Sequence, residues 1–283
     1  MKALRVLFAI LLSLVLFCLQ TALLLLFVAD RLVSPSALTT AIEGSGLVDS
    51  IVEDTLTDMG MDASAADPAP LNAYAGELVS GVVTALVRGG ELPTVEAGEL
   101  TTLLSGVLAP ALGLSADEAG ALSSLLSEQL AAELNDMLAS RTSLAVALGM
   151  SASTLAALEM LFSPMVRILL GVAVLLFGLL LVLALGKKRR SGRTGLIWWS
   201  VTAALAGIAV LLCGAGMDTV LQAAANADTA QFVAALQQAV GGAFTLFGLL
   251  GIALCAALLG LYFATRPKRR RKAAGSARPR QYA

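Results

Sequence analysis

Four long apolar stretches constrain the fold of this chain more than any other feature of its sequence. They cover Val6–Ala29, Met165–Leu185, Gly195–Met217 and Ala243–Ala264. Each is long enough to cross a hydrocarbon layer of roughly 30 Å, which takes about 20 helical residues. Membrane-spanning strands would instead show shorter segments of alternating hydrophobicity. The sequence therefore predicts an all-α integral membrane protein with four transmembrane helices.

The basic residues indicate how these four helices are oriented. Of the 19 Lys and Arg residues, 15 lie before the first span, between the second and third spans, or after the fourth. Short loops rich in Lys and Arg stay in the cytoplasm, so both termini are predicted to be cytoplasmic. The residues that determine this topology are Lys187, Lys188, Arg189, Arg190 and Arg193 in the loop, and Lys268, Arg269, Arg270, Arg271 and Lys272 in the tail.

Residues 30–163 are predicted to form an all-helical extracytoplasmic domain between the first and second spans. This segment carries 18 Asp and Glu residues against three arginines, a formal charge of −15. It contains no cysteine, so no disulfide framework is expected. Ala and Leu dominate the segment and favour helices, which we expect at 36–59, 71–88, 96–112, from Ser115 onward, and at 143–162.

The predicted order of segments follows from these spans and charges. The first span, 1–29, is expected to be an uncleaved anchor, because its apolar run is about twice the 7–15 residues of a signal-peptide core. Cleavage would leave three spans and the same orientation. The remaining segments are the domain 30–163, spans 164–186, 195–217 and 242–265, the basic loop 187–194, a short helical extracytoplasmic segment 218–241, and the disordered basic tail 266–283.

One helix of the domain carries a clear start signal and a clear pattern. Ser115 is followed three residues later by Glu118, an arrangement typical of a capping box. Leucines and one methionine then recur at steps of three and four residues, which predicts one apolar stripe. The stripe consists of Leu122, Leu125, Leu126, Leu130, Leu134, Met137 and Leu138.

Small residues in the third and fourth spans indicate close helix packing. They are spaced four residues apart, which lets helix backbones approach closely in a membrane. The pairs are Ala203 with Gly207, Ala253 with Ala257, and Ala256 with Gly260. Gln20 is the one strongly polar residue well inside a span and is expected to hydrogen-bond a neighbouring helix. Arg167 is expected to extend its side chain toward the outer membrane surface.

The sequence predicts no catalytic, cofactor-binding or metal site. Histidine is absent, which removes the commonest general base and the commonest metal ligand. The middle of each span lacks ionisable residues, so an ion-coupled transporter is disfavoured. The basic tail should contact anionic lipid headgroups of the bilayer rather than nucleic acid. A composition rich in Ala, Gly and Arg without His favours a bacterial source and hence a plasma-membrane location.

Two functional hypotheses follow. The first is a non-enzymatic bacterial envelope protein whose extracytoplasmic domain senses, binds or scaffolds a protein partner. The second rests on layout alone: one span, a large external domain and three further spans resemble the cell-division and macrolide-export type of ABC permease. That resemblance implies a permease-like subunit of a transport or mechanotransmission complex. The short loop 187–194 departs from it, because it is too short for a helix that docks on an ATPase.

Overall fold

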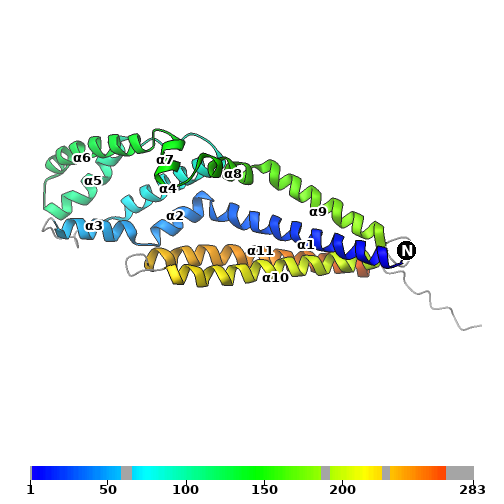
Figure 1. Ribbon diagram of the computed structural model, residues 1–283. Helices are drawn as coiled ribbons and strands as arrows, with labels where there is room; N and C mark the ends of the chain where they lie inside the picture. The colour runs from blue at the N-terminus through cyan, green and yellow to red at the C-terminus, as the bar shows by residue number, and fades with distance from the viewer. Residues whose placement is uncertain (1, 59–65, 186–191, 225–229, 266–283) are drawn as a thin grey trace, which may run out of the picture.

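Every regular element that the structure describes is an α-helix. The structure is a computed structural model and describes residues 2–58, 66–185, 192–224 and 230–265. The elements are arranged as an elongated molecule (Figure 1). In chain order they are α1 Lys2–Leu32, α2 Pro35–Glu43, α3 Leu47–Asp58, α4 Ala69–Arg88, α5 Ala97–Leu112, α6 Ala116–Met137, α7 Arg141–Ala147, α8 Ala152–Phe162, α9 Pro164–Leu185, α10 Gly192–Ala224 and α11 Ala230–Ala264. The prediction of an all-helical chain is confirmed for these residues.

Four helices are long and apolar enough to cross a membrane, as the sequence predicted. Their apolar segments are Val6–Leu32, Pro164–Leu185, Thr194–Val220 and Val233–Ala264. They are the helices of a multi-pass membrane protein. With 33 and 35 residues, α10 and α11 are each about 50 Å long, roughly 20 Å more than the hydrocarbon layer requires. This extra length includes the described part of 218–241, for which a helical extension was predicted.

Glycines bring α10 and α11 into backbone contact. A Cβ atom added at Gly207 would lie 2.5 Å from the carbonyl oxygen of Gly248 and 3.0 Å from the backbone nitrogen of Ile252. One added at Gly251 would lie 2.8 Å from the Cα atom of Gly207. Only residues without side chains allow two helices to approach this closely. The positions of these glycines therefore determine where α10 and α11 approach each other most closely.

Helix α1 packs against the other three spanning helices with two different parts of its length. Its C-terminal half contributes Leu24 and Val28 to a cluster with Val210 of α10 and Phe244 of α11. Its N-terminal half contacts α9, and the buried residues there are Ala9, Leu12, Leu16, Val174 and Leu181. Helix α1 therefore contacts α9 on one side and the α10–α11 pair on the other, and α9 also contacts α10 directly (Figure 1).

Helix α4 is central to the α2–α8 region, since it contacts α2, α3, α5, α7 and α8. Its contact with α2 is close: a Cβ atom at Gly76 would lie 2.9 Å from Cγ2 of Thr39. Helix α2 in turn contacts α11, where a Cβ atom at Gly44 would lie 3.8 Å from that of Ala235. The α2–α8 region is therefore held to the spanning helices by helix packing as well as by the chain itself.

Two helices that the sequence predicted as continuous are each broken into two. The predicted helix 36–59 ends at Glu43 and restarts as α3, and Gly46 between them has a φ of 59°. The predicted helix 143–162 ends at Ala147, Gly149 has a φ of 73°, and α7 and α8 meet at an angle of 112°. Glycine adopts positive φ without steric cost, so it ends a helix where another residue would continue it. The predictions for α4 and α5 are confirmed.

The capping box predicted at the start of α6 is present. The backbone nitrogen of Glu118 donates to the Ser115 hydroxyl, and the carboxylate of Glu118 accepts from the backbone nitrogen and the hydroxyl of Ser115. These bonds stabilise the ionised carboxylate and lower the pKa of Glu118 from its ordinary value. The start of α6 is therefore fixed by local sequence alone.

The face that α6 buries differs from the predicted apolar stripe. Small residues spaced four apart face α5, and all are 4% exposed or less: Ala119, Ser123, Ser127 and Ala131. The hydroxyls of Thr101 on α5 and Ser127 on α6 lie 2.5 Å apart. Most of the predicted stripe is exposed instead, with Leu125 at 70%. Because small side chains let α5 and α6 pack closely, they occupy the contact and the bulky leucines lie outside it.

One side-chain amide attaches the segment before α5 to α6. Asn135 accepts a hydrogen bond from the backbone nitrogen of Val95 and donates one to its carbonyl oxygen, each 2.9 Å long. Replacing Asn135 with alanine should lower the free energy of unfolding by about 2 kcal/mol, because two backbone groups of a buried residue lose their partner. Chemical denaturation and hydrogen exchange at the Val95 amide measure this. The control is Gln129→Ala, an exposed position on α6, and an equal loss there would contradict the assignment.

Candidate functional site

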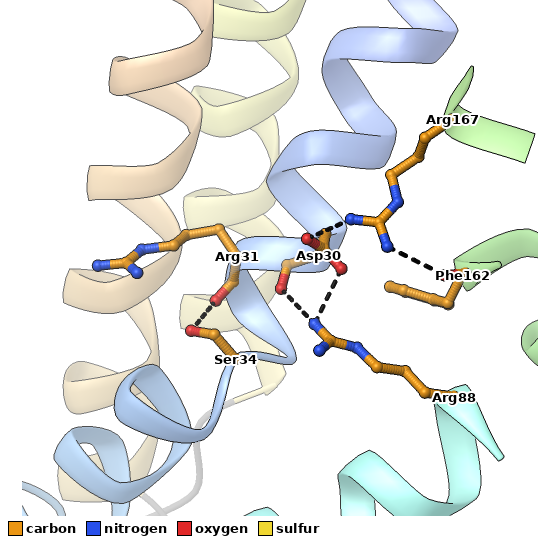
Figure 2. A network of polar contacts seen from close by, with 6 residues as sticks. All are labelled: Asp30, Arg31, Ser34, Arg88, Phe162 and Arg167. Carbon is orange, nitrogen blue, oxygen red and sulfur yellow. Dashed lines mark hydrogen bonds and ion pairs between the residues drawn. The ribbon is translucent and has the colours of Figure 1, made fainter. Parts of the chain in front are cut away.

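The carboxylate of Asp30 connects two spanning helices to the α2–α8 region. Asp30 lies in the last turn of α1, Arg88 in the last turn of α4 and Arg167 in the first turn of α9. One carboxylate oxygen, Oδ1, is 2.9 Å from Nη2 of Arg88, and the other, Oδ2, is 2.7 Å from Nη1 of Arg167. Figure 2 shows both guanidinium groups converging on this one carboxylate. We call these three residues the Asp30 junction.

The Asp30 junction also includes the end of α8. Arg167 donates from Nη2 to the carbonyl oxygen of Phe162 at 3.3 Å, which satisfies one of the free carbonyls at that helix end. The side chains are partly buried, at 24% exposure for Asp30 and Arg167 and 35% for Arg88. Neighbouring Arg31 points away from the junction, and its carbonyl oxygen accepts a bond from Ser34 (Figure 2). One carboxylate thus joins α1, α4, α8 and α9.

Helix dipoles make the pairing of Asp30 with Arg167 necessary. An acid is unfavourable at the C-terminal end of a helix and a base is unfavourable at the N-terminal end. Asp30 and Arg167 each occupy the unfavourable end of their own helix. Arg88 is at a favourable C-terminal end. The direct contact of Asp30 and Arg167 compensates both unfavourable placements, so each residue depends on the other.

A second arginine contact lies beside the junction, at the same end of α4. Arg141 donates from Nη2 to the carbonyl oxygen of Leu86 at 3.1 Å and lies 3.5 Å from Oε2 of Glu159. Gly89 follows α4 with a φ of 74°, and a Cβ atom there would overlap Oε1 of Glu159. This contact attaches α7 and α8 to the C-terminal end of α4. Among the described residues, the three arginines that form ion pairs therefore gather around one helix end.

A cavity of about 400 Å³ adjoins Arg141. The segment after α4 and the end of α6 line it, with Gly90, Thr94, Asn135 and Ser140 among the residues. The Nε atom of Arg141 is buried and has no hydrogen-bond partner. Within the described residues, no three His, Cys, Asp or Glu side chains are grouped so that they could hold a metal ion. The contacts around α4 join helices to one another.

The structure separates the predicted helix-packing residues into two groups. Ala203 and Gly207 are buried, and Gly207 lies in backbone contact with α11. Ala253, Ala256, Ala257 and Gly260 are exposed on α11, and a Cβ atom at Gly260 would have no neighbour within 4 Å. Between α10 and α11, the backbones approach closely at Gly207, Gly248 and Gly251.

The predicted topology-determining residues fall mostly outside the described part of the chain. Arg193 lies in the first turn of α10. The others are outside the described residues: Lys187, Lys188, Arg189, Arg190, Lys268, Arg269, Arg270, Arg271 and Lys272.

Two polar residues of the spans differ from expectation. Gln20 is only 4% exposed, yet neither its amide nitrogen nor its amide oxygen has a hydrogen-bond partner, so the predicted bond to a neighbouring helix is wrong. Arg167 pairs with Asp30 instead of extending alone toward the membrane surface. Thr21 on α1 and Trp199 on α10 likewise have a buried polar atom without a hydrogen-bond partner.

Sequence analysis missed the Asp30 junction, although a signal for it exists. Only four of the 19 Lys and Arg residues lie outside the three basic segments. Three of these four, Arg88, Arg141 and Arg167, form ion pairs at the end of α4 or beside it. Lys and Arg are therefore rare outside the basic segments, and this rarity is the signal in the sequence.

Comparison with family profiles, curated proteins and solved structures yields no match to this chain.

Proposed function

We propose that this chain is a non-enzymatic plasma-membrane protein of bacteria that binds or scaffolds a protein partner through its α2–α8 region. In this proposal both termini are cytoplasmic and residues 30–163 lie outside. The distribution of charge supports the orientation, because the segments assigned to the cytoplasm hold 15 of the 19 Lys and Arg and none of the 20 acids. The absence of histidine supports a binding role over a catalytic one.

The observation that carries this proposal is the Asp30 junction. A flexible linker would be enough to attach a domain to the membrane. Here Asp30 of α1 instead forms ion pairs with Arg88 of α4 at 2.9 Å and with Arg167 of α9 at 2.7 Å. Helix α2 adds packing against α11. A region held at several points keeps a fixed orientation to the membrane. Such an orientation is useful when a second protein must be positioned there.

Cysteine labelling tests the orientation. In a background with Cys18, Cys213 and Cys255 changed to serine, Thr102→Cys, at an exposed position on α5, should react in intact cells with a maleimide that cannot cross membranes. Ser191→Cys, in the basic loop, should react only after the membrane is permeabilised. Gel mobility or mass spectrometry of the labelled protein measures both. Labelling of Ser191→Cys in intact cells without labelling of Thr102→Cys would reverse the topology.

Purification from native membranes tests the binding role. The full-length protein is extracted in mild detergent, and proteins recovered in stoichiometric amount are identified by mass spectrometry. Recovery of a partner with an extracytoplasmic domain supports the proposal. Recovery of a cytoplasmic ATPase in equal amount would overturn it in favour of a permease-like subunit. Recovery of neither would also contradict a stable scaffold.

A further inference from the structure

Five large apolar side chains lie exposed along one side of α6. They are Leu122, Leu125, Leu126, Leu130 and Met137, with exposures between 40% and 70%. We call them the leucine face. Exposed large side chains are ordinary when scattered, but a row on one helix marks a surface for another molecule.

The leucine face has no role in holding α6 in place. The contact of α6 with α5 is made by Ala119, Ser123, Ser127 and Ala131, all buried. The start of α6 is fixed by the Ser115 capping box, and Asn135 near its end bonds the backbone of Val95. Other residues therefore provide the packing and the polar contacts of α6. The leucine face remains free to bind.

The location of α6 in the molecule argues against lipid as the molecule that covers the leucine face. Helices α3, α5 and α6 lie at the end of the molecule opposite the N-terminus of α1 (Figure 1). The spanning segments of α1 and α9 end at Leu32 and begin at Pro164. Carboxylates next to the leucine face would also be repelled by anionic headgroups. A protein segment is the better occupant.

Charge determines which kind of protein segment fits. Residues 89–140 contain eight Asp and Glu and no Lys or Arg. Glu133 is three residues after Leu130 and four before Met137, and Glu118 is four before Leu122, so these carboxylates share the side of the helix that carries the leucine face. A second copy of this chain would bring like charges together. A basic partner would neutralise them.

We propose that the leucine face binds a basic amphipathic helix, with its apolar stripe on the leucines and its Lys or Arg residues beside Glu118, Glu128, Glu133 and Asp136. Leu122, Leu126 and Leu130 recur every four residues, which is the spacing that a parallel or antiparallel partner helix matches. The face from Leu122 to Met137 is about 23 Å long, enough for a partner helix of roughly 15 residues. This inference rests on the proposed function and names the chemistry of the partner.

The test uses the full-length protein in zwitterionic phosphatidylcholine nanodiscs. The probe is a fluorescein-labelled peptide of 18 residues, made of Leu and Lys in an amphipathic helical pattern, with empty nanodiscs as the blank. Fluorescence anisotropy gives the Kd. The double variant Leu125→Ser/Leu130→Ser should raise the Kd at least tenfold while the circular dichroism spectrum stays unchanged. A Leu/Glu peptide of the same pattern should not bind.

Matched variants separate this surface from general effects of charge and hydrophobicity. Glu128→Gln/Glu133→Gln/Asp136→Asn should weaken binding at least tenfold. Glu53→Gln/Asp54→Asn/Asp58→Asn on α3 removes the same charge from exposed positions and should leave the Kd within twofold. Val146→Ser/Leu148→Ser removes exposed apolar side chains elsewhere and should also change little. Equal loss in either control would overturn the assignment.

Two further outcomes would also overturn it. Unchanged peptide binding by Leu125→Ser/Leu130→Ser would place the site elsewhere. A wild-type dimer in mass photometry that this variant turns into a monomer would make the occupant a second copy of the chain. If native partners are still recovered with that variant, only the leucine-face proposal fails. If the wild-type protein recovers no native partner, the proposed function fails, whatever the result for the leucine face.

Discussion

Replacing Gly207 with leucine should separate α10 from α11 and lower the midpoint of thermal unfolding by roughly 5–10 °C. The closest atom to a Cβ at this position is the carbonyl oxygen of Gly248, at 2.5 Å, followed by the backbone nitrogen of Ile252 at 3.0 Å. Backbone atoms in the middle of a helix cannot turn aside as a flexible side chain can. The two helices must therefore move apart, which also disturbs the cluster that Val210 and Phe244 form with α1.

Gly260 is the matched control for this substitution. It lies on α11, and a Cβ atom there would meet nothing within 4 Å. Gly260→Leu adds the same side chain to an open position and should change the midpoint by less than about 2 °C. Thermal unfolding of the purified protein in one detergent, followed by a thiol-reactive dye or by scattering, compares the three proteins. Equal midpoints for Gly207→Leu and Gly260→Leu would show that the α10–α11 contact is not close.

Replacing Asp30 with asparagine should loosen the α2–α8 region from α1 and α9. The change removes two ion pairs and leaves Arg88 and Arg167 near each other without a carboxylate. Because the three side chains are 24–35% exposed, water screens part of the effect, and we expect a loss of about 1–3 kcal/mol rather than the 3–5 of a fully buried pair. Hydrogen exchange should increase at the end of α4 and through α8 before it increases in the spans.

A double-mutant cycle distinguishes the ion pairs from other effects of Asp30. If the pairs act as described, Arg88→Gln and Arg167→Gln should each cost less in the Asp30→Asn background than in wild type. Arg31→Gln serves as the control, since Arg31 is adjacent in sequence but points away from the junction (Figure 2). Additive losses throughout the cycle would mean that Asp30 stabilises the fold by some route other than these arginines.

Features that depend on local sequence could be predicted, whereas those that depend on contacts between distant helices could not. The spans follow from length and hydropathy, and the start of α6 follows from Ser115 and Glu118 alone. The breaks at Gly46 and Gly149 were missed, because a glycine within a helical pattern does not reveal whether its φ is positive. The buried side of α6 was also missed, since both the Leu stripe and the Ala/Ser stripe have helical spacing. Only the proximity of α5 decides between them.

The Asp30 junction is a further contact between distant helices that the sequence could not predict. Asp30 is 58 residues from Arg88 and 137 from Arg167 in sequence. No periodicity connects residues at such separations. The sequence shows only that Lys and Arg are scarce outside the three basic segments. That scarcity singles out four arginines, Arg88 and Arg167 among them, but does not identify their partners.

The length of the α10–α11 pair has a consequence for which insertions and deletions the chain can accept. Gly251 of α11 touches Gly207 of α10, while Ala235, sixteen residues earlier on the same helix, faces Gly44 of α2. A single residue inserted between positions 235 and 251 turns one end of α11 relative to the other by about 100°. One of the two contacts must then be lost. Insertions of seven residues nearly restore the helical phase but add about 10 Å of length. The contact of α11 with α2 and its contact with α10 therefore require the same helical phase.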